Sequence, residues 1–113
     1  MSYKDAAQQF GDLIAEQKYA AAWERLTKEA QTSITPEGIQ AAVAAMIAYG
    51  TGPILEAQVV EDAIVETWPG KQPNDFAVVY VALTGENFSE AVTLTLAQYG
   101  EGILIRQLEW GRP

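Results

Sequence analysis

Residues 76–110 constrain the fold most, because they read as three consecutive antiparallel strands whose hydrophobic face the rest of the chain must cover. The segment Phe76–Thr84 is apolar on both of its alternating sides, which predicts a central strand covered on both faces. Further along, Val92, Leu94 and Leu96 alternate with alanine and threonine. A sheet of this kind must bury a face, so we expect helices from the N-terminal half to pack on it.

The last two strands predict a hairpin with a defined register. Gly100-Glu101 suits a two-residue turn, because a type II′ turn prefers glycine at its first position. One face then carries the pairs Leu96–Ile105, Leu94–Gln107 and Val92–Glu109, and the other carries Ala97–Leu104, Thr95–Arg106, Thr93–Leu108 and Ala91–Trp110. A slip of one residue would exchange the two sets of side chains, so the coherence of these pairs supports the register.

The N-terminal half predicts three helices. Residues 3–17 and 19–26 place apolar side chains at helical spacing. The third helix begins at Thr35-Pro36-Glu37, where threonine can cap, proline suits the first helical position and a carboxylate meets the positive end of the helix dipole. We expect this helix to reach about Tyr49, because Gly50 follows.

The middle of the chain changes to an extended pattern. Residues 54–68 predict one long strand interrupted near Glu61-Asp62-Ala63, or two short strands, and residues 69–75 predict a loop with two prolines and a glycine. The expected fold class is therefore α+β. We expect a single domain over residues 1–113, with three N-terminal helices packed on a curved antiparallel sheet of about four strands.

Composition excludes several functions. The 113 residues carry a formal charge of −8 with only seven basic side chains, which argues against nucleic acid or an anionic membrane as a partner. The absence of cysteine and histidine removes thiol nucleophiles, thiolate metal sites and the commonest general base. Glu61 and Asp62 are poor cation ligands, because adjacent strand side chains point to opposite faces. We expect no metal and no cofactor.

The sequence also bears on location. No segment approaches the roughly 20 apolar residues of a transmembrane helix, and the first residues lack a basic region followed by an apolar run. The expected location is cytoplasmic, or periplasmic or secreted only if a signal peptide has been removed.

Four stretches of the chain carry a resemblance to a known family. They are Gln17-Lys18-Tyr19-Ala-Ala-Ala-Trp23, Ile34-Thr35-Pro36-Glu37, the region of Gly50, and Glu90-Ala-Val-Thr-Leu with a short turn into Gly102-Ile-Leu-Ile. Together with helices followed by an antiparallel sheet, they resemble the nuclear-transport-factor-2-like (cystatin-like α+β) superfamily, and in particular its small bacterial members of unknown function. The resemblance covers nearly the whole chain.

This resemblance implies a cone-shaped fold whose helices and concave sheet face can enclose a pocket, with an outer sheet face that often forms a dimer interface. Functions in the superfamily range from steroid isomerases and dehydratases to non-catalytic binding proteins, so the fold alone assigns none of them. The dehydratase pattern needs histidine, which this chain lacks, and no residue matches the catalytic aspartate of the isomerase.

The candidate catalytic residues are Glu109 and Tyr80. The predicted register places Glu109 and Gln107 on the face that carries Leu94, where a carboxylate beside an apolar cavity would have a raised pKa. The simpler alternative is that both lie near the open end of a strand. Tyr80 joins Glu109 only if the turn at Gly85-Glu86-Asn87 has three residues; a two-residue or four-residue turn points Tyr80 outward instead.

Aromatic residues complete the candidate pocket. Trp23 and Tyr49 line it together with Tyr80, Gln107 and Glu109, or else they belong to the core. The favoured function is a non-catalytic ligand-binding or protein-interaction domain, because no nucleophile is paired with a base. The alternative is a small-molecule isomerase or lyase with Glu109 as base and Tyr80 as hydrogen-bond donor. A filled space between helices and sheet would count against that alternative.

The predicted register also suggests a homodimer. It puts Leu104, Leu108 and Trp110 on the outer face of the sheet, across from a strand of small residues: Ala91, Thr93, Thr95 and Ala97. Burying each large side chain is worth about 1.5–3 kcal/mol, and large residues opposite small ones suit a two-fold interface. Arg106 lies within this patch and is expected to pair with an acidic residue of the second copy.

Overall fold

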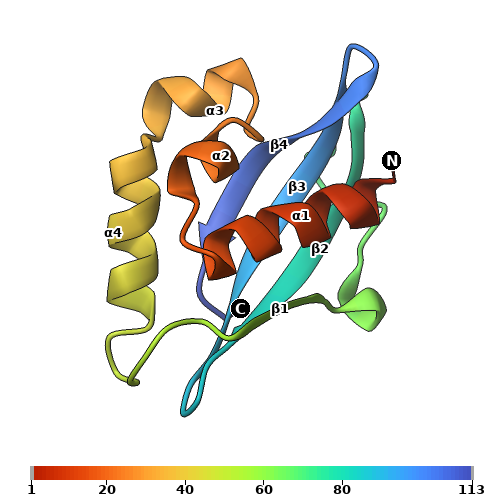
Figure 1. Cartoon of the computed structure of the whole chain (residues 1–113). Coiled ribbons are helices and arrows are strands. Elements are labelled where there is room, and N and C mark those ends of the chain that lie inside the picture. Colours follow the sequence, from red (N-terminus) through yellow and green to blue (C-terminus); the bar gives the residue numbers. More distant parts are fainter. Residues whose placement is uncertain (1, 113) are drawn as a thin grey trace.

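The structure is a computed structural model that describes residues 2–112, in which N-terminal helices pack on a four-stranded antiparallel sheet (Figure 1). The helices are α1 (Tyr3–Ala15), α2 (Tyr19–Trp23), α3 (Lys28–Ser33) and α4 (Pro36–Met46). The strands are β1 (Glu56–Val59), β2 (Asp75–Thr84), β3 (Ser89–Tyr99) and β4 (Gly102–Trp110), and a 3₁₀ turn, η1 (Glu61–Ala63), follows β1. The α+β class is confirmed, and α3 is an additional short helix.

Side-chain caps determine where the helices begin. The Ser2 hydroxyl accepts a hydrogen bond from the Asp5 N–H at 3.2 Å, and the Asp5 carboxylate accepts one from the Ser2 N–H at 3.3 Å. Thr35 caps α4 as expected, with its hydroxyl 2.9 Å from the Gly38 nitrogen. α1 is shorter than predicted because Gln17 takes a left-handed φ of 62°, which lets the Lys18 N–H close the helix on the Leu13 carbonyl.

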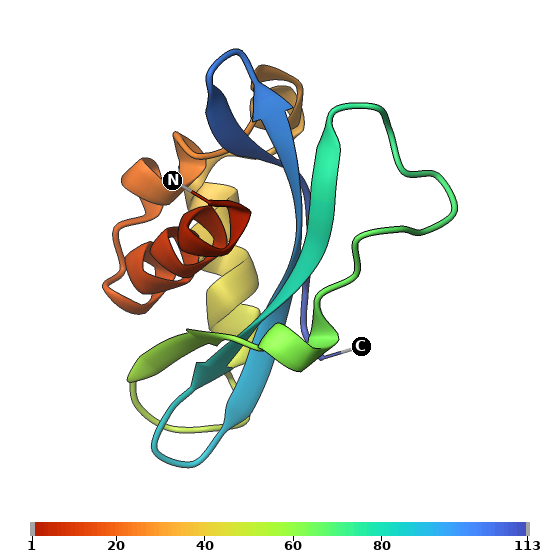
Figure 2. The same cartoon turned by 90° about the vertical axis from the view of Figure 1, so that its right-hand side faces the viewer.

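The strands occur in the order β1-β2-β3-β4, and every neighbouring pair is antiparallel. The predicted interruption of the first extended segment is confirmed: η1 separates β1 from Val65, which forms an isolated bridge with Val78 of β2. The helices lie on one side of the sheet, called here the inner face (Figure 2). The segment between η1 and β2 swings to the opposite side, the outer face.

A β-bulge in β4 corrects the predicted register. The pairs Leu96–Ile105 and Ala97–Leu104 form as expected, but the pairing then shifts between Thr95 and Leu96. The extra residue is Arg106, so that Gln107 rather than Arg106 is aligned with Thr95. Beyond this point the observed partners are Thr95–Gln107, Leu94–Leu108, Thr93–Glu109 and Val92–Trp110, and the predicted pairs of Leu94, Val92, Thr95, Thr93 and Ala91 are wrong.

The bulge exchanges the faces of the last four residues of β4. Leu108 and Trp110 turn to the inner face and pack against the core, where the Trp110 ring lies 6.2 Å from that of Phe10 in α1. Gln107 and Glu109 turn to the outer face and are exposed. The predicted register is wrong here, because it places Leu108 and Trp110 on the outer face and Gln107 and Glu109 on the inner face.

The core fills the space between helices and sheet. Ala77, Val79, Val81 and Leu83 of β2 have no exposed surface, whereas the alternate residues Val78, Tyr80 and Ala82 are partly exposed on the outer face. The prediction that β2 is fully covered on both faces is therefore wrong for the outer face. The largest fully buried side chains are Phe10, Ile14, Leu26, Ile39, Leu83, Leu94, Leu96, Ile105, Val79, Val81 and Val92.

Part of each edge of the sheet is covered by another segment of the chain. The Gln8 amide of α1 donates to the Ala57 carbonyl at 2.7 Å and accepts from the Val59 N–H at 3.1 Å, so it takes the place of a neighbouring strand beside β1. At the other edge, Leu26 forms a parallel bridge with Ile105 of β4. None of the helices within residues 2–112 is long and apolar enough to cross a membrane.

Candidate functional site

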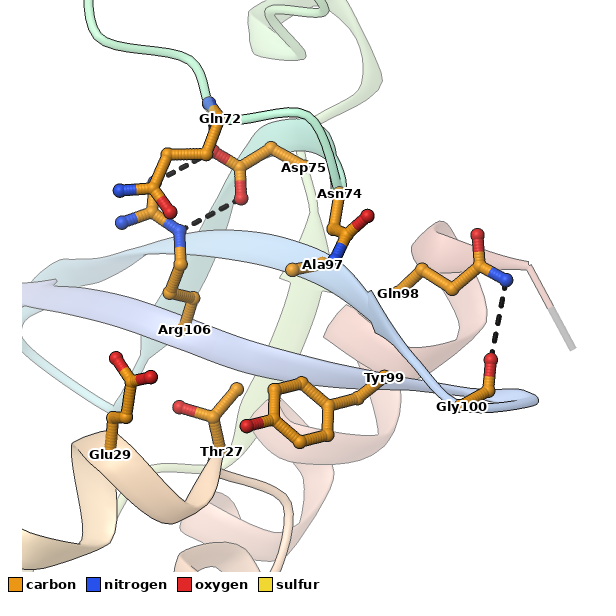
Figure 3. Close-up of a pocket in the computed structure, with 10 residues that line it drawn as sticks. All are labelled: Thr27, Glu29, Gln72, Asn74, Asp75, Ala97, Gln98, Tyr99, Gly100 and Arg106. Carbon is orange, nitrogen blue, oxygen red and sulfur yellow. Dashed lines mark hydrogen bonds and ion pairs between the residues drawn. The ribbon is translucent and has the colours of Figure 1, made fainter.

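A polar pocket of about 370 Å³ opens at the end of the sheet, beside the turn between β3 and β4 (Figure 3). Four parts of the chain form it: the start of β2 with the residues before it, the end of β3 with the turn after it, Arg106 in the middle of β4, and the start of α3. Its lining residues are Thr27, Glu29, Gln72, Asn74, Asp75, Ala97, Gln98, Tyr99, Gly100 and Arg106.

An ion pair between Asp75 and Arg106 forms one wall of this pocket. The Arg106 Nε lies 2.8 Å from Asp75 Oδ1 and its Nη2 lies 2.7 Å from Oδ2, which is the two-pronged geometry of a strong guanidinium–carboxylate pair. The Asp75 side chain has no exposed surface, and that of Arg106 is 23% exposed. The Gln72 N–H also donates to Asp75, at 2.9 Å.

The ion pair shifts the pKa of both groups in the direction that keeps them charged. The hydrogen bond from Arg106, helped by the Gln72 N–H, lowers the pKa of Asp75 against the opposing effect of burial. The same contact raises the pKa of Arg106. Both groups therefore stay charged at neutral pH, and neither is suited to exchange protons with a substrate.

Both partners of the ion pair lie at irregularities of the sheet. Arg106 is the extra residue of the bulge in β4, between the pairs Leu96–Ile105 and Thr95–Gln107. A second irregularity in β2, between Asp75 and Ala77, sets Asp75 apart from the regular alternation of that strand. Phe76 is the residue within it, and its ring stacks on Tyr3 of α1 on the helix side.

The remaining lining groups are mostly uncharged hydrogen-bonding side chains. Within residues 2–112, the side chains of Gln72, Asn74 and Tyr99 make no hydrogen bond to the protein, while Gln98 donates to the Gly100 carbonyl at 3.3 Å. Figure 3 shows Tyr99 beside Thr27, with the amides of Gln72 and Asn74 across the pocket. Within the same residues, no group of three or more acidic side chains is placed to hold a metal ion.

A second, smaller hollow of about 200 Å³ lies on the outer face of the sheet. Residues of β2, β3 and β4 line it, together with Trp68 from the segment before β2. The lining residues are Trp68, Val78, Thr93, Thr95, Gln107, Leu108 and Glu109. It shares no residue with the polar pocket.

The structure brings the two candidate catalytic residues to one face, but they share no cavity: Glu109 lines the hollow on the outer face and Tyr80 does not. Four residues separate the paired Thr84 and Ser89, which is the turn length expected to point Tyr80 outward. Tyr80 pairs with Thr93, and Thr93 pairs with Glu109, so the three residues form one row across the outer face. The α-carbons of Tyr80 and Glu109 are thus about 10 Å apart, two strand spacings.

The aromatic pocket candidates Trp23 and Tyr49 make hydrogen bonds that connect elements of the fold. The Trp23 indole donates to the Ile34 carbonyl at 2.6 Å, and the Trp23 carbonyl accepts from Gln31, which ties α2 to the connection before α4. The Tyr49 side chain is 61% exposed, and its hydroxyl bonds both backbone groups of Ser89. Neither residue is close to Gln107 or Glu109 in a shared pocket.

The residues of the predicted dimer patch are divided between the two faces. Thr93 and Thr95 lie on the outer face as expected, and Leu104 faces the same way opposite Ala97. Leu108 and Trp110 pack against the core instead. Arg106 points outward, but its partner is Asp75 of the same chain.

The sequence analysis does not predict the polar pocket, because its residues are far apart in the chain and form no motif. Asp75 and Arg106 are separated by 31 positions, and Gln72 and Asn74 belong to a segment that reads as a loop. One signal was present: Arg106 is a lone charge within the apolar Ile103–Leu108 run, and such a residue needs a partner when it is partly buried.

Comparison with known proteins identifies no relative of this chain, so the site is interpreted from its own geometry. A scan of protein-family models, and searches of curated proteins and of solved structures, found no significant match to this chain.

Proposed function

We propose that this chain is a non-catalytic ligand-binding domain that takes a small polar molecule in the pocket beside Asp75 and Arg106. The observation that carries the proposal is the two-pronged ion pair. It engages the buried carboxylate and the partly exposed guanidinium with each other, so neither is available as an acid or a base. The neighbouring amides and hydroxyls, by contrast, are free to form hydrogen bonds with a ligand. The arrangement suits recognition rather than a reaction.

The lining defines the class of ligand. Gln72, Asn74 and Tyr99 present donors and acceptors without partners in the described chain, and Asp75 and Arg106 cancel each other's charge. Glu29 at the rim disfavours anions. A volume of about 370 Å³ is near the lower end of the usual ligand-pocket range of ~300–1,000 Å³. We therefore infer a small uncharged ligand with several hydroxyl or amide groups.

We also propose that the chain belongs to the nuclear-transport-factor-2-like superfamily. Its support is the order of elements, with helices preceding an antiparallel sheet of four strands. The proposed site differs from the pocket implied by the superfamily, because Phe10, Ile14 and Leu94 fill the space between helices and sheet. The isomerase or lyase alternative required Glu109 and Tyr80 in a closed cavity, and no observation favours it.

Homodimerisation through the outer face stays a prediction. Its main driving force was to be the burial of Leu108 and Trp110, and both now pack against the chain's own core. The outer-face residues Thr93, Thr95 and Leu104 supply a smaller apolar area.

Protein-detected NMR with a panel of monosaccharides, disaccharides and nucleosides tests the ligand-binding proposal. We expect saturable shifts of the side-chain amide signals of Gln72, Asn74 and Gln98 with at least one compound. Gln72→Ala should weaken that binding about fivefold, the effect of one lost neutral hydrogen bond of about 1 kcal/mol.

The matched control is Gln58→Ala, which removes the same group from an exposed position on β1 and should leave the affinity unchanged. The proposal is wrong if no compound moves the pocket signals. It is equally wrong if the shifts map to the core between helices and sheet.

A further inference from the structure

We propose that the hollow beneath Trp68 on the outer face binds a lysine or arginine side chain presented by a partner protein. The hollow shares no residue with the polar pocket, so this inference is independent of the proposed ligand. It rests on three observations: a carboxylate and other acceptors without partners, an aromatic ring already in contact with a cation, and the size and charge of the surface.

The acceptors are among the residues that line the hollow. Glu109 is exposed and forms no ion pair within residues 2–112. The side chains of Gln107 and Thr95 likewise make no hydrogen bond in that part of the chain, although Thr95 is only 7% exposed. A carboxylate, an amide oxygen and a hydroxyl oxygen therefore line one small space. Such a group of hydrogen-bond acceptors suits an ammonium or guanidinium group, which carries only donors.

Trp68 supplies an aromatic wall of the kind that attracts cations. The Lys71 ammonium lies 5.5 Å from the centre of its ring, within the range of a cation–π contact. Lys71 also donates to the Glu66 carbonyl and does not line the hollow, so it leaves the hollow side of Trp68 unoccupied. A second cation entering there would meet the ring on one side and Glu109 on the other.

Size and charge decide which occupant fits. At about 200 Å³ the hollow is below the usual range for small-molecule ligands, which begins at ~300 Å³, but it can accommodate a single side chain. The chain carries a net charge of −8, which favours a basic partner. A second copy of this acidic chain would bring Glu56 and Glu109 of both copies to the same interface, so like charges would oppose it.

Three capped pentapeptides provide the test. Each has one central residue, lysine, arginine or norleucine, between glycine and serine residues, and each is titrated to about 10 mM while the Trp68 indole and the Thr93 and Thr95 amides are followed by NMR. We expect saturable shifts with the lysine and arginine peptides and none with norleucine. Glu109→Gln and Trp68→Leu should each weaken binding about three- to fivefold.

The matched control is Glu56→Gln, which removes the same charge from the same face but outside the hollow, and it should change the affinity less than twofold. Several results would overturn the inference. These are shifts of equal size with norleucine, equal weakening by Glu56→Gln and Glu109→Gln, no shift with any peptide, or sedimentation of the wild type as a dimer that Glu109→Gln stabilises. Because the polar pocket contributes no residue to the hollow, failure here leaves the ligand-binding proposal standing.

Discussion

A buried carboxylate is costly unless its charge is compensated, and a single guanidinium compensates Asp75. The Asp75 side chain is fully buried, it accepts two hydrogen bonds from Arg106 and one from the Gln72 backbone, and it connects β2 with the bulge of β4. Removing one partner would leave the other charge unpaired. These two residues therefore affect both the stability of the sheet and the shape of the polar pocket.

Asp75→Asn should lower the free energy of unfolding by about 2–4 kcal/mol. Breaking a fully buried pair costs about 3–5 kcal/mol, and the loss is smaller here because Arg106 is partly exposed. Urea unfolding of the variant and of wild type measures the difference. Asp62→Asn, which alters an exposed carboxylate in η1, is the control and should change stability by less than about 0.5 kcal/mol. An equal effect of the two variants would contradict this role.

The same pair makes stability depend on pH in the acidic range. The folded-state pKa of Asp75 is lower than its ordinary value of 3.8, so its contribution is fully present above that value. The contribution is lost as the pH falls through the lowered pKa of the folded state. Stability measured from pH 6 downward should fall less steeply below about pH 4 in Asp75→Asn than in wild type. Parallel curves would show that Asp75 titrates normally.

At the scale of elements, the two edges of the sheet are each covered in part, by different means. The β4 edge receives Leu26 as a short parallel neighbour, and the β1 edge receives the side-chain amide of Gln8. The Gln8 amide imitates a peptide group, since it donates to one backbone group of β1 and accepts from another. Open strand edges attract other chains, so these contacts also oppose edge-to-edge aggregation.

Gln8→Ala should lower the free energy of unfolding by about 1–2 kcal/mol, because two hydrogen bonds are lost and water replaces them only in part. Hydrogen exchange gives the more specific measurement: the Val59 amide should exchange faster in the variant, while the amides of β3 should be less affected. Gln40→Ala on the exposed side of α4 is the control. Unchanged protection of Val59 would contradict the proposed contact.

Local signals predicted most of the elements. The caps at Thr35 and the interruption at Glu61–Ala63 are determined by neighbouring residues, and both are confirmed. The Gly100-Glu101 turn is also confirmed, with φ of 63° at Gly100, and so are the first hairpin pairs. The pairing fails only where an extra residue enters β4, because a register counted outward from a turn assumes strict alternation.

At the scale of the whole molecule, the bulge at Arg106 determines which groups each face presents. It directs Leu108 and Trp110 into the core beneath the helices, and it leaves Gln107 and Glu109 on the outer face beside Trp68. The bulged residue Arg106 also supplies one partner of the ion pair in the polar pocket. Neither site was predictable from the sequence, because each combines strand residues with a loop whose path depends on tertiary packing.

The most direct test of this account is the set of through-space NMR contacts made by the Trp110 indole. With the bulge, we expect cross-peaks between the Trp110 ring and the Phe10 ring, whose centres are 6.2 Å apart, and none to the methyl groups of Ala82 and Ala91. Without the bulge, Trp110 would lie opposite Ala91 on the outer face. Cross-peaks to the Ala91 and Ala82 methyl groups, with none to Phe10, would contradict the register and, with it, the placement of Gln107 and Glu109 in the hollow beside Trp68.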